Sequence, residues 1–239
     1  MTRPLALVTG GARRLGREFA LSLACMGFAV GLHYHASESQ AQATAEILYG
    51  VGVPVYLLRA DLSQPAEIDH LMRRVRELPE PMTVLVNSAA VISAARPHDL
   101  SLSDWDLTLD VNLRAPFLLA QAAARIMPEG SLIVNVSDVG AQKAWTRFSA
   151  YSVSKAGLEA LTRLLARAFA PSIRVNAIAP GLVFHSDVVS YQEWKRLVNR
   201  IPLRRPARPD EITSTLEFLI RNQYITGQTI VVDGGYSLL

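Results

Sequence analysis

The sequence contains a single cysteine, no long hydrophobic run and no block of like charge. Cys25 can form no intrachain disulfide, and no Cys/His spacing typical of a metal site is present, so we expect no bound metal. Its place in an apolar helical pattern predicts that Cys25 packs in the core. The chain has no uninterrupted apolar run of about 18 residues and no charged-then-apolar leader. These absences predict a cytoplasmic protein that does not span a membrane.

Charged residues are sparse and nearly balanced. They make up 19% of the chain, with a formal net charge of +3. The densest basic spots, Arg73-Arg74 and Arg204-Arg205, are too short to mark a polyanion site. No basic run with interleaved aromatic residues is present, which argues against a nucleic-acid partner. A chain of 239 residues, half of them hydrophobic, has room for a large core, and we expect its partner to be a small molecule.

Short apolar runs alternate with helical patterns along the whole chain. The runs are continuous, as is typical of strands that are buried on both faces. Seven such strands, each followed by a helix until the last, predict an α/β fold: a Rossmann-type doubly wound parallel sheet in one domain over residues 1–239. The predicted strands are 5–9, 29–34, 55–60, 84–86, 132–136, 174–178 and 229–232, and the predicted helices are 15–26, 40–49, 66–78, 103–126, 150–168 and 211–221.

One segment breaks this rhythm. Residues 184–209 are rich in charge and proline, and an insertion of that length is more often a functional lid than a disordered linker. We therefore predict a substrate loop there.

A glycine-rich turn, Thr9-Gly10-Gly11-Ala12-Arg13-Arg14-Leu15-Gly16, lies between the first predicted strand and the first predicted helix. Glycines at the start allow a tight turn, and Gly16 allows the helix to approach the sheet closely. Free N–H groups at the helix start can then bind a pyrophosphate. The strand–turn–helix context favours a dinucleotide site over a glycine-rich turn without a ligand.

The end of the second predicted strand indicates which dinucleotide is bound. NAD sites place an acidic residue there for the ribose 2′-hydroxyl. This chain instead reads His33-Tyr34-His35-Ala36-Ser37, with no acid before Glu38. Arg13 and Arg14 lie in the facing turn. Cationic and hydroxyl groups suit a 2′-phosphate, so the sequence favours NADPH over NADH, although either histidine could be an ordinary loop residue.

Three further polar positions follow strands or interrupt a helix. Asp61-Leu62 would lie near an adenine edge, although Asp61 or Ser63 could also be a helix N-cap. Asn87-Ser88-Ala89 ends the fourth predicted strand, at the edge where ligands bind in such sheets. Asn112 lies in the middle of a predicted helix, where Asn is a poor helix former. It could serve a structural hydrogen bond or hold a water for proton relay.

Tyr151 and Lys155 lie one turn apart on a predicted helix, so their side chains can meet. An ammonium group close to a phenol favours the phenolate and would lower the phenol pKa towards neutrality. Such a pair can exchange a proton with a substrate oxygen. The same spacing is also common on solvated helices. The pair therefore indicates a catalytic site only together with the other motifs of the chain.

Taken in order, these motifs resemble those of the short-chain dehydrogenase/reductase family over essentially the whole chain. The matching elements are Thr9-Gly10…Gly16, Asp61-Leu62, Asn87-Ser88-Ala89, Asn112, Tyr151…Lys155 and Pro180-Gly181, with Val183 assigned to the same cofactor edge. The resemblance implies a nicotinamide cofactor, Tyr151 as proton donor and Lys155 on the nicotinamide ribose. It further implies Asn112 in a water relay and a homotetramer.

Two departures from the family pattern point to one branch. Arg14 stands where the family usually has glycine, and Asp138 stands where it has a catalytic serine. Both changes, and the His33-Tyr34-His35 triplet, resemble the pteridine reductase branch. That resemblance implies that Arg14 and Ser37 help to bind NADPH and that Asp138 works with Tyr151 in supplying a proton. A pterin presents amide-like donors and acceptors, which a carboxyl group matches better than a hydroxyl.

The substrate pocket departs from that branch. Val91 and Ile92 replace the aromatic residue that stacks on a pterin, and Ala36 replaces an arginine. Phe184 or Trp145 could supply the aromatic face, or both could pack in the core or lid. We predict an NADPH-dependent reductase of a pterin or dihydropterin, with Arg14 contacting both cofactor and substrate.

Two alternatives remain. One is a carbonyl reductase, for example of a 3-oxoacyl thioester, in which Ser137 or a water replaces the missing serine. The other is a non-catalytic NADPH-binding sensor, which the intact tyrosine–lysine pair disfavours.

Overall fold

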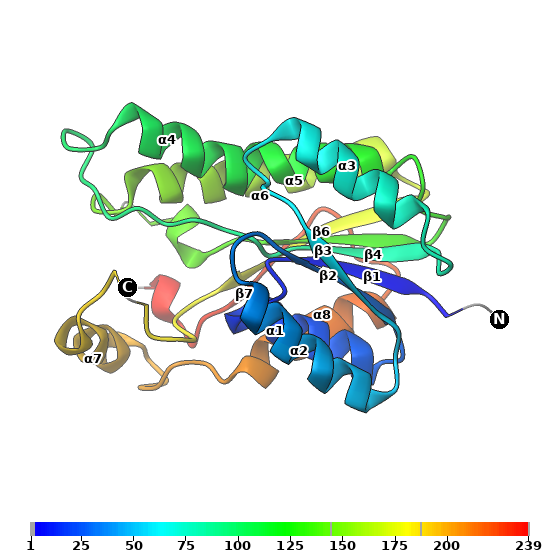
Figure 1. Ribbon diagram of the computed structural model, residues 1–239. Coiled ribbons are helices and arrows are strands. Elements are labelled where there is room, and N and C mark those ends of the chain that lie inside the picture. Colours follow the sequence, from blue (N-terminus) through cyan, green and yellow to red (C-terminus); the bar gives the residue numbers. More distant parts are fainter. Residues whose placement is uncertain (1–2, 144, 187, 239) are drawn as a thin grey trace.

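The computed structural model describes residues 3–143, 145–186 and 188–238 (Figure 1). Its centre is a seven-stranded sheet in the order β3-β2-β1-β4-β5-β6-β7, and all neighbouring strands pair in parallel. The predicted doubly wound sheet is confirmed. The strands are β1 (Leu5–Thr9), β2 (Ala29–Tyr34), β3 (Val55–Arg59), β4 (Met82–Asn87), β5 (Ser131–Val136), β6 (Ile173–Pro180) and β7 (Thr229–Val232).

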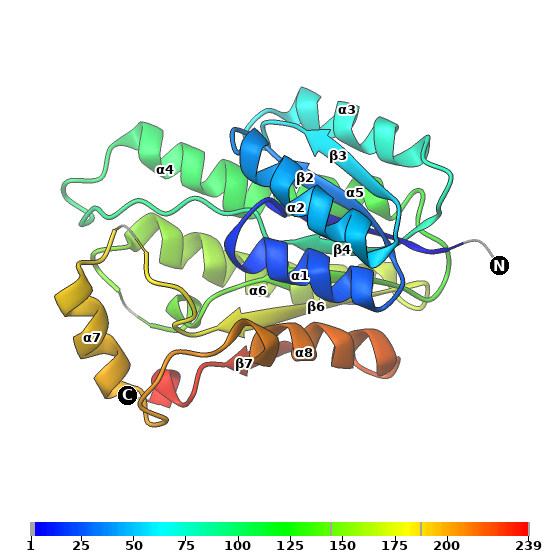
Figure 2. The ribbon, with the colours of Figure 1, turned by 60° about the horizontal axis from the view of Figure 1, so that its bottom comes forward.

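Helices cover both faces of the sheet (Figures 1 and 2). On one face lie α1 (Arg14–Cys25), α2 (Glu38–Val51) and α8 (Pro209–Arg221); on the other lie α3 (Pro65–Arg76), α4 (Leu102–Leu109), α5 (Ala115–Ala123) and α6 (Ser149–Phe169). Each face has its own apolar core. In β1, Val8 packs in the first core and Leu7 in the second. This two-sided burial explains why the strand sequences are apolar without alternation.

The helix predicted over 103–126 is three consecutive pieces. Between α4 and α5 lies a π-helical turn, η1 (Asp110–Arg114), in which the Ala115 N–H bonds to the Asp110 carbonyl. Pro116 is in the first turn of α5 and has no N–H to continue a regular helix. The turn carries Asn112, and such insertions are frequent at functional sites.

The segment predicted as a lid contains a helix that the sequence interpretation missed. This helix, α7 (Tyr191–Arg200), lies beyond the carboxyl edge of the sheet, at lower left in Figure 1. The Ser190 side chain caps it by accepting from the Glu193 N–H at 3.2 Å. The Ser-x-x-Glu pattern before an apolar-periodic run was the signal that could have revealed it.

The structure corrects the expected position of Cys25 in α1. Cys25 is exposed, so its predicted core position was wrong. It ends α1 one residue beyond the buried stripe of Phe19, Leu23 and Ala24, on the side that faces solvent. No helix within the described residues is both long enough and apolar enough to cross a membrane.

Candidate active site

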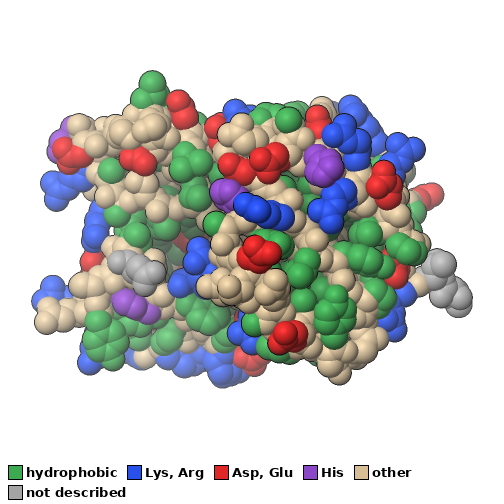
Figure 3. All heavy atoms as spheres, viewed as in Figure 1, with side chains coloured by type: hydrophobic (Ala, Val, Ile, Leu, Met, Phe, Trp, Pro, Cys, Tyr) green, Lys and Arg blue, Asp and Glu red, His purple; other side chains and the backbone are tan. Residues whose placement is uncertain are grey.

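A cavity of about 1040 Å³ opens at the carboxyl edge of the sheet. Figure 3 shows this face hollowed between the lobes that carry α4 and α7. Asn87 and Asn112 are the only candidate residues absent from its wall. Those that line it are Gly10, Arg13, Arg14, Leu15, Gly16, His33, Tyr34, His35, Ser37, Asp61, Leu62, Ser88, Ala89, Val91, Ile92, Asp138, Trp145, Tyr151, Lys155, Pro180, Gly181, Val183 and Phe184.

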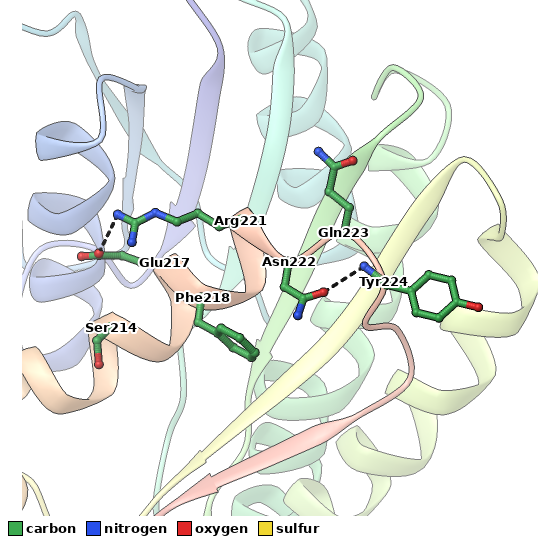
Figure 4. A pocket seen from close by; sticks show the side chains of 7 residues that line it. All are labelled: Ser214, Glu217, Phe218, Arg221, Asn222, Gln223 and Tyr224. Atoms are coloured by element: carbon green, nitrogen blue, oxygen red, sulfur yellow. Dashed lines mark hydrogen bonds and ion pairs between the residues drawn. The ribbon is translucent and has the colours of Figure 1, made fainter.

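A second, shallower depression lies on the outer side of the C-terminal part of α8 (Figure 4). There Arg221 pairs with Glu217 at 3.3 Å, and the Tyr224 N–H donates to the Asn222 side chain at 3.0 Å. Phe218 lies beside them. None of the residues predicted to be functional lies in this depression, so the first cavity is the candidate active site.

The glycine turn is built for close approach of backbones. Gly10 has a φ of +64°, and a Cβ atom there would lie 2.9 Å from the Ala89 Cα. A Cβ atom on Gly16 would overlap the Gly10 carbonyl. No side chain caps the N-terminus of α1, so its first backbone N–H groups are free to bind an anion. The turn therefore fits the pyrophosphate of a dinucleotide.

Arg14 keeps the backbone conformation that glycine favours. Its φ is +52°, which costs an L-residue roughly 1–2 kcal/mol. The guanidinium donates to the carbonyl oxygens of His185 at 3.0 Å and Phe184 at 3.3 Å, and its Cζ lies 5.6 Å from the Phe184 ring centroid. Arg14 thus joins the glycine turn to the segment that leads into α7.

Replacing Arg14 separates backbone strain from side-chain contacts. Both Arg14→Gly and Arg14→Ala remove the bonds to Phe184 and His185, but only glycine also relieves the positive φ. We expect Arg14→Gly to have a free energy of unfolding about 1 kcal/mol higher than Arg14→Ala. Urea unfolding of the two variants measures the difference. Equal stabilities would contradict a strained backbone at this position.

His33 holds the glycine turn in place through a hydrogen bond to Gly10. Its Nδ1 accepts from the Gly10 N–H at 3.1 Å, so Nε2 carries the proton and donates to the Ala60 carbonyl at 3.0 Å. Burial lowers the pKa of His33 to about 4, so the ring is neutral at neutral pH. Both ring nitrogens are thus used inside the protein. The structure thus shows His33 positioning the glycine turn, and its predicted contact with the cofactor stays a prediction.

This neutral histidine predicts a pH-dependent stability. Its pKa is about 4 in the folded chain, against 6.5 for an unperturbed histidine, so between these values the unfolded chain binds more protons and stability falls as pH falls. From about pH 7.5 to about pH 5, the free energy of unfolding should drop by about 2 kcal/mol more in the wild type than in His33→Gln. Urea unfolding at both pH values measures this, and parallel losses would refute it.

The ends of β2 and β3 carry His35, predicted near the 2′-phosphate, and Asp61, predicted near the adenine edge. His35 Nε2 lies 3.9 Å from an Asp61 carboxylate oxygen, and both side chains reach solvent. The other Asp61 oxygen accepts from the Ser63 N–H at 2.9 Å. Helix α3 begins later, with Gln64 as its N-cap, so neither Asp61 nor Ser63 caps it. Asp61 therefore remains available at the cavity edge.

Both candidate asparagines have structural partners. Asn87 donates to the Asn135 side chain at 2.8 Å within the sheet, and the predicted cofactor contact of Asn87 has no support from the cavity wall. Asn112 clamps the backbone of Val91, donating to its carbonyl and accepting from its N–H, each at 2.9 Å. It also donates to Ser154 at 3.1 Å. Asn112 thus shapes the cavity by holding Val91, and its role in a water relay stays a prediction.

The residues with acid–base chemistry meet at the ends of β5 and α6. The Tyr151 hydroxyl donates to Asp138 Oδ2 at 2.9 Å, and Asp138 Oδ1 accepts from the Gly140 N–H at 2.6 Å. Lys155 Nζ donates to the Val136 carbonyl at 2.7 Å and lies 5.6 Å from the Tyr151 ring centroid. A carboxyl group and a phenol therefore share one proton-exchange site.

Neighbouring Ser137 faces a different partner. The strand β5 ends at Val136, and the Ser137 hydroxyl donates to the buried carboxylate of Glu159 at 3.0 Å. Its hydroxyl is therefore directed away from the phenol that Asp138 contacts. Because this hydroxyl is occupied by Glu159, Ser137 is a poor substitute for a catalytic serine.

The pKa shift of Tyr151 is opposite to the one expected from the tyrosine–lysine spacing. Burial and the negative charge of Asp138 raise the phenol pKa well above its ordinary value. Burial also raises the pKa of Asp138, against the N–H of Gly140, and lowers the pKa of Lys155 to about 8. Burial is the larger cause for Tyr151, and the direct contact of its hydroxyl with Asp138 adds to it, while Lys155 bonds to the Val136 carbonyl. Tyr151 is thereby kept protonated, as a proton donor requires.

Several wall residues were missed by the sequence interpretation. They come from the segment before α6, from the lid region and from the C-terminal turn η3 (Tyr236–Leu238). Tyr236 packs against Trp145 with ring centroids 6.2 Å apart, and this contact joins positions far apart in sequence. The main additions are Arg147, Phe148, Val188, Glu193, Trp194, Leu197 and Tyr236.

Known proteins are similar to this chain over nearly its full length. The family model described as enoyl-(acyl carrier protein) reductase matches residues 10–237. A 3-oxoacyl-[acyl-carrier-protein] reductase of Synechocystis sp. is 31% identical over 98% of this chain and 97% of its own length. Carbonyl reductase family member 4 of Danio rerio is 36% identical, with 98% of each chain covered.

A solved structure is also similar to this chain over its full length. FolM alternative dihydrofolate reductase 1 from Brucella canis, complexed with NADP, superposes with a TM-score of 0.94 and 34% identity, covering 100% of this chain and 95% of its own. The family model and both kinds of similar protein therefore match nearly the full length of the chain. The chain belongs to the short-chain dehydrogenase/reductase family.

Proposed function

We propose that this protein is an NADPH-dependent reductase that transfers hydride to a pterin or dihydropterin. The observation that carries the proposal is the carboxyl group of Asp138, which accepts a hydrogen bond from the Tyr151 hydroxyl inside the cavity at 2.9 Å. A carboxyl group matches the donors and acceptors of a pterin ring. The similarity to an alternative dihydrofolate reductase that binds NADP supports the same substrate class.

The cofactor is NADP(H), held along the carboxyl edge of the sheet. Gly10, Leu15 and Gly16 would hold the pyrophosphate at the start of α1. Arg13, Arg14, His35 and Ser37 would surround the 2′-phosphate, and the edge made by Leu62, Ser88, Ala89 and Val183 would border the rest. When bound, the nicotinamide supplies the hydride.

The chain's own residues supply the proton. Reduction of a C=N bond in a dihydropterin adds hydride at carbon and a proton at nitrogen. Tyr151 is placed to give its hydroxyl proton, because burial and Asp138 keep the phenol protonated. Asp138, whose pKa is itself raised by burial, can return a proton to Tyr151 through their hydrogen bond. Lys155 contributes positive charge on the same helix face.

A carbonyl reductase is the second candidate, because a 3-oxoacyl-[acyl-carrier-protein] reductase and a carbonyl reductase are among the similar proteins. This reaction would need a hydroxyl donor in place of the missing serine. Ser137 is the nearest serine in sequence, and its hydroxyl is directed to Glu159. We therefore rank ketone reduction below pterin reduction.

Parallel assays separate the two candidates. NADPH oxidation is followed with 7,8-dihydrobiopterin, dihydrofolate and an acetoacetyl thioester, with NADH as the comparison cofactor. The proposal expects turnover of a dihydropterin and a preference for NADPH. Turnover of the thioester alone would reject the pterin assignment in favour of the carbonyl reductase.

We also propose a cytoplasmic homotetramer. Exposed apolar side chains support further association, namely Leu107, Phe117, Val153 and Leu164 on the α4–α6 side and Phe218, Tyr224 and Leu238 near α8 and the C-terminus. Exposed apolar patches commonly mark interfaces. Sedimentation analysis measures the assembly directly.

A further inference from the structure

Arg147 brings a positive charge to the substrate side of the cavity. It lies four residues before Tyr151, and it lines the same cavity as Asp138. Its Nη2 donates to the Val188 carbonyl at 2.9 Å, and its Cζ lies 5.6 Å from the Phe148 ring centroid. These two contacts fix the guanidinium at the boundary between the catalytic segment and the lid region.

Glu193 occupies the next position on this guanidinium. Arg147 Nη1 donates to Glu193 Oε2 at 3.0 Å, and the two side chains are 47% and 41% exposed. Glu193 is in the first turn of α7 and also lines the cavity. An exposed ion pair of this kind contributes little stability because water screens it and two long side chains must be ordered. Exchanging Glu193 for another carboxylate would therefore cost little.

The other lysine and arginine side chains of the described cavity wall lie at the glycine turn or bond to a backbone carbonyl. Arg13 and Arg14 lie at the glycine turn, and Arg14 bonds to the carbonyls of Phe184 and His185. Lys155 donates to the Val136 carbonyl. Arg147 is thus the cation beside α7 that can meet a ligand, and a planar guanidinium suits a carboxylate in particular.

We propose that Arg147 is a specificity-determining residue that binds a carboxylate on the substrate's tail, in exchange for Glu193. This inference rests on the proposed pterin function and deepens it. The substrate class becomes a dihydropterin with an anionic side chain, such as the glutamate-bearing tail of dihydrofolate, rather than one with a short neutral side chain.

The test compares two ligands that differ only in tail charge. Folate and folate dimethyl ester are titrated calorimetrically into the NADP-loaded enzyme. The wild type should bind folate more tightly than the diester. Arg147→Gln should weaken folate binding about tenfold or more, because a hydrogen bond to a charged group is lost, and should weaken diester binding much less. Glu193→Gln should strengthen folate binding roughly two- to fivefold by removing the competing carboxylate.

Arg196→Gln is the matched control, because Arg196 is exposed on α7 but does not line the cavity. It should leave the folate-to-diester ratio as in the wild type, and thermal unfolding of each variant checks its fold. Equal binding of both ligands by the wild type, or equal losses for both in Arg147→Gln, would overturn the carboxylate subsite alone. Binding of neither ligand would overturn the proposed pterin function and the subsite with it.

Discussion

Tyr151→Phe is expected to lower kcat by about 10²- to 10⁴-fold, the range that a positioned general acid supplies. The substitution keeps the ring and removes only the hydroxyl, which donates a hydrogen bond to Asp138 at 2.9 Å. Steady-state NADPH oxidation with the preferred dihydropterin measures the loss. NADPH affinity should change far less, because we propose that the glycine turn, and not the Tyr151 hydroxyl, binds the phosphates.

The control is binding of NADPH to the variant, followed by fluorescence. Retained binding together with lost turnover assigns Tyr151 to the chemical step. Undiminished turnover on a true substrate would remove the phenol from the mechanism. Since Tyr151 is the assumed proton donor for both pterin and carbonyl reduction, that result would count against both candidate functions.

Asp138→Ala is expected to cost about 10²-fold or more in kcat, while Ser137→Ala should cost only a few-fold. The two residues are adjacent, but only Asp138 contacts the Tyr151 hydroxyl, whereas Ser137 donates to Glu159. Removing the carboxyl group also leaves the partly buried phenol without its hydrogen-bond acceptor. Parallel kinetics of the two variants on a dihydropterin and on an acetoacetyl thioester measure the difference.

Thermal unfolding of both variants separates lost chemistry from lost structure, since Ser137→Ala removes a partner of a buried hydrogen bond and Asp138→Ala a partner of a partly buried one. Similar losses on every substrate for the two variants would contradict the assignment of Asp138. A larger loss for Ser137→Ala on the thioester would instead support the carbonyl reductase.

The sequence alone was sufficient for the architecture and for most of the cavity wall. The continuous apolar strands, the glycine turn before α1 and the order of the later motifs predicted the parallel sheet. Because the carboxyl ends of parallel strands meet at one edge, residues that follow six separate strands could be assigned to one site from the sequence alone. Helical spacing likewise placed Tyr151 and Lys155 on one face.

Only the tertiary structure decided which groups act on one another. It showed that Tyr151 is buried and that its hydroxyl bonds to Asp138, while Lys155 bonds to the Val136 carbonyl; burial first and Asp138 second reversed the expected pKa shift of Tyr151. It showed that both ring nitrogens of His33 bond within the protein, one of them to the glycine turn, and the cofactor contact of His33 stays a prediction. These outcomes depend on burial and on contacts between residues distant in sequence. The local sequence determines on which helix or strand end a side chain lies, and the packing of the whole chain determines which groups surround it.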